Sequence, residues 1–206
     1  AGELFETFEE ELVRKSSEQL ILGFAGRYTE WKNWPLAVEI SKRLNEKLKD
    51  KLQVKMAVGC LDKMSERETK DMFNELNQIF GNRFNGMINI DIEAMNRFYY
   101  DIDIFILTSN HNTESFGRTL VEAMSRKTVT LTTNAGGSVE VVGNLQNVCN
   151  TPEEFEKRIL EFYNDKNMME NEKRKNIERV KEKYSLRNNI EKHVNLYNTF
   201  AKREIL

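Results

Sequence analysis

The sequence contains little proline, cysteine or histidine and no long apolar run. Its 206 residues include two prolines, ten glycines and two histidines, so no segment has the composition of a linker. We therefore expect a single domain over residues 1–206. No apolar stretch approaches the roughly 20 residues of a membrane span, and no secretory signal pattern is present. These absences predict a cytoplasmic protein, or one peripheral to the inner face of a membrane.

Charge and cysteine content exclude further classes. Lys and Arg number 31 and Asp and Glu number 33, which gives a net charge of −2 and no electrostatic case for nucleic-acid binding. The two cysteines, Cys60 and Cys149, lie in apolar surroundings and are expected to be reduced structural thiols. Their spacing does not suit a zinc site, which needs about four ligands. We expect neither a metal ion nor a cofactor.

Short apolar runs alternate with segments of helical periodicity along the chain. This alternation predicts a doubly wound, mostly parallel α/β sheet of Rossmann-like form, followed by C-terminal helices. The predicted strands are residues 20–25, 54–58, 84–88, 104–107 and 129–133, with a short sixth at Val148. The predicted helices are residues 35–48, 65–80, 92–100, 119–125, 155–164, 167–184 and 186–200, with a capping box at residues 151–154 before the fifth of them. Residues 3–16 also have the apolar spacing of a helix, and the alternative is a lead-in segment without one.

Glycines and polar residues follow the predicted strands. In a parallel sheet these positions share one edge, where ligands of such sheets bind. Gly26 and Arg27 end the first strand, and Lys32 follows closely. Arg binds phosphate oxygens through a planar fork and Lys supplies a point charge, so the two could form a diphosphate clamp. The alternative is a pair of solvated surface charges.

The second candidate region lies between the fourth strand and the following helix. Glu114 and Glu122 are separated by seven residues, and a Ser115-Phe116-Gly117 turn follows the first of them. Carboxylates accept hydrogen bonds from paired sugar hydroxyls, and backbone N–H groups at a helix start can face a phosphate. The alternative is two ordinary glutamates, the first favoured by the helix dipole.

Four segments, in order, resemble the C-terminal donor-binding domain of a GT-B glycosyltransferase of the retaining family four, or group one, set. They cover most of the chain between Leu20 and Tyr197. The segments are Gly26-Arg27 with Lys32 (G-R-x4-K), residues 100–109 (Y-D-I-D-I-F-I-L-T-S, with one residue of spacing difference), residues 114–124 (E-S-F-G-R-T-L-V-E-A-M) and residues 136–140 (G-G-S-V-E). The sequence departs from the family pattern at Asn33, Thr108, Arg118 and Lys127.

The resemblance implies a role for each matching residue. Arg27 and Lys32, with Gly26 beside them, would hold the diphosphate of a nucleotide sugar and offset its charge as it leaves. Glu114 would bind hydroxyls of the transferred sugar, and Glu122 would accept both ribose hydroxyls. The amides of Ser115, Phe116 and Gly117 would lie near the phosphates or the sugar. Apart from the resemblance, the position of Asn89 after the third strand predicts that it faces the base.

The resemblance also implies that a second, N-terminal domain binds the acceptor, a glycan or lipid-linked molecule. The chain starts at Ala1-Gly2 without Met, which suggests a cloning scar and a piece of a longer protein that would be inactive alone. Two other classes stay open. A nucleotide-sugar epimerase of the same fold would need histidines for proton transfer, and only two are present. A non-catalytic interaction module would have no need of the four charged motif residues.

A dinucleotide dehydrogenase is disfavoured, because no G-x-G-x-x-G follows the first strand. The Asp101-Ile102-Asp103 segment looks like the D-x-D of metal-dependent glycosyltransferases of the other fold. Because it leads directly into a strand, we expect a solvated strand entry there.

Overall fold

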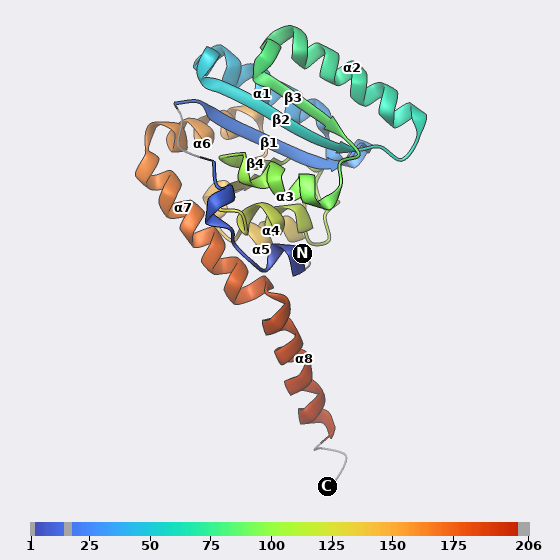
Figure 1. The fold of residues 1–206 in the computed structure, drawn as a ribbon, viewed down its shortest axis with the longest axis vertical. Coiled ribbons are helices and arrows are strands. Elements are labelled where there is room, and N and C mark those ends of the chain that lie inside the picture. Colours follow the sequence, from blue (N-terminus) through green and yellow to red (C-terminus); the bar gives the residue numbers. More distant parts are fainter. Residues whose placement is uncertain (1–2, 15–17, 202–206) are drawn as a thin grey trace.

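The computed structural model of the chain describes residues 3–14 and 18–201 (Figure 1). Its centre is one five-stranded parallel sheet with the strand order β3-β2-β1-β4-β5. The predicted doubly wound α/β fold is confirmed. The strands are β1 (Leu20–Arg27), β2 (Leu52–Gly59), β3 (Phe84–Ile88), β4 (Ile104–Leu107) and β5 (Val129–Thr132).

Helices connect the strands and continue after the last one. The α-helices are α1 (Trp34–Leu48), α2 (Lys63–Phe80), α3 (Ile92–Tyr100), α4 (Arg118–Met124), α5 (Gly137–Val142), α6 (Pro152–Asn164), α7 (Lys166–Arg179) and α8 (Leu186–Ala201). A short π-helix, Val180–Tyr184, joins α7 to α8. The single helix predicted over residues 167–184 is therefore an α-helix up to Arg179 and a π-helix after it. None of the described helices is both long enough and apolar enough to cross a membrane.

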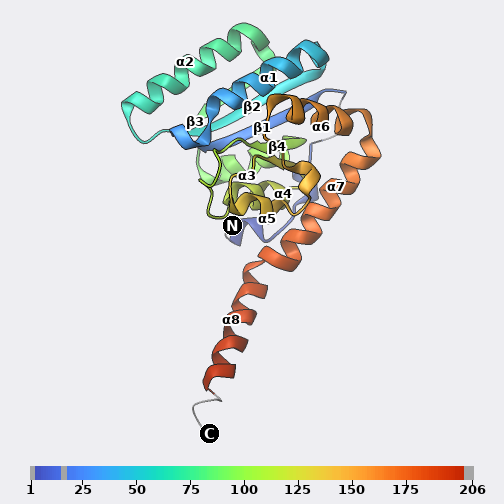
Figure 2. The same ribbon diagram turned by 180° about the vertical axis from the view of Figure 1, so that it is seen from behind.

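The sheet is covered on both faces, because neighbouring residues of a strand point to opposite sides. Leu20, Leu22 and Phe24 of β1 pack in one cluster with α1, α2 and α6. Ile21 and Ala25 pack in the other, with α3, α4 and α5 (Figure 2). Each fully buried leucine or phenylalanine stabilises the fold by roughly 1.5–3 kcal/mol relative to an exposed one. The two layers therefore hold the carboxyl ends of the strands in fixed register.

The strand order reverses between β1 and β4. From β1 the chain adds β2 and β3 on one side, and β4 and β5 lie on the other. Such a reversal leaves a crevice outside the carboxyl ends of the two central strands, the usual ligand site in this class of sheet. The loops that follow β1 and β4 flank this crevice.

Two local predictions about helices are wrong. Residues 3–14 contain only two 3₁₀ turns, Glu3–Phe5 and Glu10–Leu12, in place of the predicted helix; its last residues, 15–16, lie outside the described residues, as do residues 1–2. Helix α2 begins at Lys63, with Asp62 and Ser65 forming the capping box that was expected from Ser65 and Glu68.

Both differences have physical causes. An isolated helix of about a dozen residues is marginal in water, so tertiary contacts decide its conformation. Here Arg126, which is 1% exposed, donates hydrogen bonds to the carbonyls of Leu4 and Thr7 and holds the segment against the domain. At α2, the Asp62 carboxylate accepts from the Ser65 amide at 2.7 Å, and Asp is among the strongest N-cap residues.

The predicted sixth strand is reduced to one bridge. Val148, which belongs to no strand, forms a bridge with Thr132 at the end of β5, and the Cys149 amide donates to the Thr132 carbonyl at 2.8 Å. The segment just before α6 therefore lies beside the end of β5.

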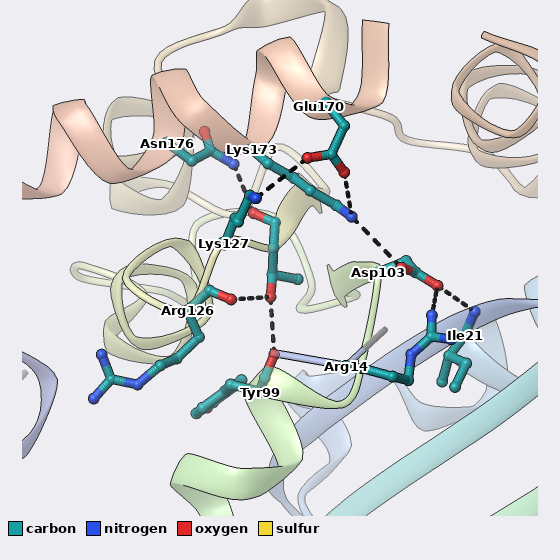
Figure 3. A network of polar contacts seen from close by, with 10 residues as sticks. Arg14, Ile21, Tyr99, Asp103, Arg126, Lys127, Glu170, Lys173 and Asn176 are labelled. Carbon is teal, nitrogen blue, oxygen red and sulfur yellow. Dashed lines mark hydrogen bonds and ion pairs between the residues drawn. The ribbon is translucent and has the colours of Figure 1, made fainter. Parts of the chain in front are cut away.

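A polar network closes the amino edge of the sheet, opposite the crevice (Figure 3). Asp103 accepts from Arg14 and from the Ile21 amide (3.0 Å), and it pairs with Lys173 of α7 at 3.5 Å. Lys173 also pairs with Glu170 at 3.0 Å. Because its side chain is 17% exposed and ion-paired, the prediction of a solvated strand entry at Asp103 is wrong. Among the described residues, no group of acidic, Cys or His side chains is arranged for a metal ion.

Candidate functional site

Arg27, the last residue of β1, and Lys32, in the loop that follows, both line the crevice. The loop is held by hydrogen bonds from the Trp34 indole to the Arg27 carbonyl (3.1 Å) and from the Thr108 hydroxyl to the Lys32 carbonyl (2.8 Å). A Cβ built on Gly26 would lie 3.4 Å from the Lys32 side chain, so that side chain runs directly over the end of β1. Within the described part of the chain, Arg27 forms no ion pair. Among the described residues, the Arg27 guanidinium is therefore without an ion-pair partner, and the Lys32 ammonium group beside it is ion-paired.

The loop that carries Glu114 is supported by a pair of glycines. The Glu114 amide donates to the Ala135 carbonyl and the Gly137 amide to the Glu114 carbonyl, both at 2.8 Å. A Cβ on Gly137 would lie 2.2 Å from the Ser115 carbonyl oxygen, and Gly136 has a φ of +105°. Only glycine allows this close approach of two backbones. The G-G motif therefore shapes the loop that follows β4.

Backbone N–H groups in this loop are available to a ligand. Among the described residues, the amides of Ser115, Phe116 and Gly117 have no hydrogen-bond acceptor. The ring of Phe116 packs edge-on against Tyr184 at a centroid distance of 5.5 Å, which ties the loop to the π-helix before α8. A loop held in this way can offer donors in a fixed arrangement.

Lys32 and Glu114 meet across the crevice. The Lys32 ammonium contacts Oε1 of Glu114, and the Ser109 hydroxyl donates to the same oxygen at 2.7 Å. The two charged side chains are only 14% and 13% exposed, so water screens the pair weakly. In the described part of the chain, Oε2 of Glu114 has no hydrogen-bond donor and can accept from a ligand.

Glu122 lies on α4, and its side chain is 12% exposed. Its Oε2 accepts a hydrogen bond from the Tyr99 hydroxyl at 3.0 Å, and its Oε1 lies 3.2 Å from Nε of Arg118. Burial raises the pKa of the Glu122 carboxyl above its ordinary value, while the Tyr99 hydrogen bond and the Arg118 charge oppose that rise. Burial and the nearby Glu122 charge raise the pKa of Tyr99 well above its usual range, so its hydroxyl stays a donor.

All the residues predicted for the site line one cavity of about 490 Å³. Asn89 is at its edge, but its side-chain amide bonds both backbone groups of Cys60, at 2.7 and 3.1 Å, and so joins the ends of β2 and β3. The cavity also has lining residues that the sequence reasoning did not assign to it, among them Ile90, Met95, Tyr99 and Thr119. A signal for Tyr99 was present, since starting the Y-x-x-x-D pattern at Tyr99 instead of Tyr100 removes the spacing difference to Asp103.

The histidines lie elsewhere. His111 is exposed and bonds the Asn134 carbonyl at 2.8 Å, and His193 bonds the Asn189 carbonyl within α8. Neither lines the cavity.

Comparison with solved structures supports the fold assignment. The C-terminal domain of the group 1 glycosyl transferase LpcC from Francisella tularensis has a TM-score of 0.69 at 17% identity, with 81% of this chain and 87% of that one covered. HepE from Anabaena, in complex with UDP and glucose, has a TM-score of 0.71 at 16% identity, with 87% of this chain and 48% of that one covered. A glycosyltransferase from Rickettsia africae has a TM-score of 0.69 at 21% identity, with 91% and 49% covered.

The chain thus spans about half the length of the Anabaena and Rickettsia proteins. A search of curated protein sequences gave no significant match. The family model for "Glycosyl transferases group 1" matches residues 6–192, which is most of the chain. The chain belongs to the group 1 glycosyl transferases.

Proposed function

We propose that the chain is the donor-binding half of a retaining glycosyltransferase and that its cavity holds a nucleoside diphosphate sugar. The observation that carries the proposal is the gathering of Arg27, Lys32, Glu114 and Glu122 around one cavity at the reversal of the strand order. These residues come from separate parts of the chain and present two cations and two carboxylates. That set matches the diphosphate and the two sugar rings of such a donor.

The diphosphate binds at the Arg27 side of the cavity. Arg27 has no carboxylate partner among the described residues, and the unpaired amides of residues 115–117 lie in the facing loop. As the bond to the sugar breaks, negative charge grows on the leaving diphosphate. Cations and amides already in place stabilise that charge without reorganisation. Lys32 joins them once the ligand competes with Glu114.

The two carboxylates bind the two sugars. Glu114 keeps Oε2 without a partner among the described residues and accepts hydroxyls of the transferred hexose. Glu122 accepts both ribose hydroxyls, since each carboxylate oxygen can take more than one hydrogen bond. The HepE structure, which contains UDP and glucose on the same fold, supports this class of ligand.

The acceptor binds to a second, N-terminal domain, and the chain by itself turns over little or no substrate. The chain's coverage of about half of two longer family structures supports this part of the proposal. Helix α8 supports it too, because it extends away from the domain (Figures 1 and 2). Its apolar side chains are exposed, among them Ile190, Val194, Tyr197 and Phe200. The acceptor is a glycan or a lipid-linked glycan, and the protein acts in the cytoplasm or at the inner membrane face.

Calorimetric titration of the full-length protein with UDP, ADP and GDP tests the donor site. We expect one of them to bind, Arg27→Ala and Lys32→Ala to weaken its binding at least about tenfold, and Glu122→Ala to abolish it. Lys70→Ala is the matched control, because Lys70 pairs with Glu66 on the surface of α2. No binding of any nucleotide would favour a non-catalytic module. The configuration of the product's anomeric carbon, read by NMR, tests retention.

A further inference from the structure

Tyr99 has a buried ring, and its hydroxyl is directed at Glu122. Tyr99 is 0% exposed, lines the cavity and donates to Oε2 of Glu122 at 3.0 Å. The other oxygen faces Arg118, whose side chain is 74% exposed. Of the two donors to Glu122, Tyr99 is therefore buried in the core and Arg118 is exposed to solvent.

The position of Tyr99 is fixed by its surroundings. Its ring contacts those of Phe5, Phe98 and Phe105 edge-on, at centroid distances of 6.1, 5.4 and 5.6 Å. Its carbonyl accepts from the Thr128 hydroxyl at 3.0 Å (Figure 3). A side chain held at its ring and its backbone cannot turn away from Glu122 without disrupting the core.

The Tyr99 hydroxyl favours the ionised form of the Glu122 carboxyl. Burial disfavours the ionised form of Glu122, and the hydrogen bond from Tyr99 acts against this by lowering the pKa of that carboxyl. An ionised carboxylate only accepts hydrogen bonds, whereas a protonated one presents a hydroxyl to the ligand. Because Oε2 has a further acceptor site, the Tyr99 bond leaves room for a ligand hydroxyl.

We propose that Tyr99 is a positioning residue for donor binding: it holds the Glu122 carboxylate in the orientation that accepts the ribose hydroxyls. The inference rests on the proposed function, since it requires a ribose at Glu122. Arg118 is the secondary, exchangeable partner. The hydroxyl of Tyr99 contributes to affinity only through Glu122.

The test compares Tyr99→Phe with Tyr100→Phe in the full-length protein. Tyr100 is also buried, but its hydroxyl accepts from the Glu9 amide at 2.7 Å, away from the cavity. The probes are UDP and 2′,3′-dideoxyuridine diphosphate, or the corresponding adenosine or guanosine pair if ADP or GDP binds instead. We expect Tyr99→Phe to weaken UDP about tenfold and to leave the dideoxy compound unchanged. Tyr100→Phe should change neither affinity.

A pH profile separates positioning from packing. In Tyr99→Phe, Glu122 keeps the charges of Arg118 and Arg126 nearby but loses its buried donor, so its pKa rises further. Binding of UDP should then fall off at a higher pH than in the wild type as the solution is acidified. A simple loss of packing would lower the affinity for UDP at every pH. It would not move the acid limb of the profile, that is, the pH range over which binding falls off on acidification.

The outcomes are distinguishable. Wild-type binding with an unaltered Tyr99→Phe affinity, or an equal loss for the ribo and dideoxy probes, overturns the inference and leaves the proposed function standing. No nucleotide binding by the wild type overturns both.

Circular dichroism checks that Tyr99→Phe folds. If it does not, biosynthetic 3-fluorotyrosine in the Tyr100→Phe background supplies a stronger donor and should move the acid limb to lower pH; an unmoved limb overturns the inference.

Discussion

The ammonium group of Lys32 is ion-paired with the carboxylate of Glu114 across the reversal of the strand order. The two residues are 82 positions apart in the chain, and the pair joins the loop after β1 to the loop after β4. The cation that the proposed function assigns to the diphosphate thus contacts the carboxylate that it assigns to the sugar. A diphosphate at this position would compete with Glu114 for Lys32, and this consequence can be measured.

Glu114→Gln removes the negative partner of Lys32 and keeps the size of the side chain. We expect UDP to bind more tightly, by about fivefold or on the order of 1 kcal/mol, because Lys32 then has no carboxylate to leave. UDP-glucose should gain less, since the amide accepts sugar hydroxyls less well than a carboxylate. Titration calorimetry gives both affinities. Glu75→Gln, which breaks the surface pair with Lys42, is the control; weaker UDP binding to Glu114→Gln would contradict the prediction.

Gly137→Ala should distort the loop that carries Glu114. The new Cβ would stand 2.2 Å from the Ser115 carbonyl oxygen, so the backbone must move. We expect a loss of about 1–3 kcal/mol in the free energy of unfolding, as for other overpacked sites, together with weaker nucleotide binding. Urea denaturation and calorimetry measure the two effects.

Gly81→Ala is the control for backbone strain at a distance. Gly81 has a φ of +56°, and an added Cβ would meet no other atom within 4 Å; the residue follows α2 and lies outside the cavity. This variant should lose stability but bind nucleotide as the wild type does. Equal binding losses in both variants would show that the Gly137 contact does not shape the site.

Arg126→Leu should destabilise the protein by about 3 kcal/mol, because buried hydrogen-bond acceptors lose a charged donor. The guanidinium bonds the carbonyls of Leu4 and Thr7 and the Asn96 side chain, and it stacks over Phe5 and Tyr100. Residues 3–14 should become sensitive to proteolysis at the same time. Limited trypsin digestion and urea denaturation check this, with the half-exposed Arg97→Leu as the control. A protected N-terminal segment in folded Arg126→Leu would refute it.

Iodoacetamide at pH 8 should modify Cys60 and spare Cys149. Burial raises the pKa of the Cys149 thiol to about 12, so almost none of it is thiolate at that pH. Cys60 is partly exposed. The raised pKa also means that the stabilising contribution of neutral Cys149 is complete below pH 9 and is lost as the pH rises toward 12. Mass spectrometry of native and urea-unfolded samples reads the labelling, and Cys60→Ser should leave the native protein unlabelled.

Much of the fold could be predicted because its signals are local. Each buried strand is a short apolar run, and a glycine or polar residue follows most of them. The sequence therefore predicts that the site forms at the carboxyl edge of the sheet. The conformation of residues 3–14 could not, because a buried arginine more than 100 positions away decides it. The capping box of α2 was misplaced by one turn, because Asp62 and Ser65 both suit an N-cap.

The sequence by itself determined the strands, the layers and the residues that reach the carboxyl edge, because hydrophobic period and turn chemistry act between near neighbours. Tertiary structure alone decided which side chains touch there: Lys32 with Glu114, Tyr99 with Glu122, and Asn89 with the Cys60 backbone. Those contacts depend on strand order, register and side-chain rotamers, and these are fixed only when both faces of the sheet are packed.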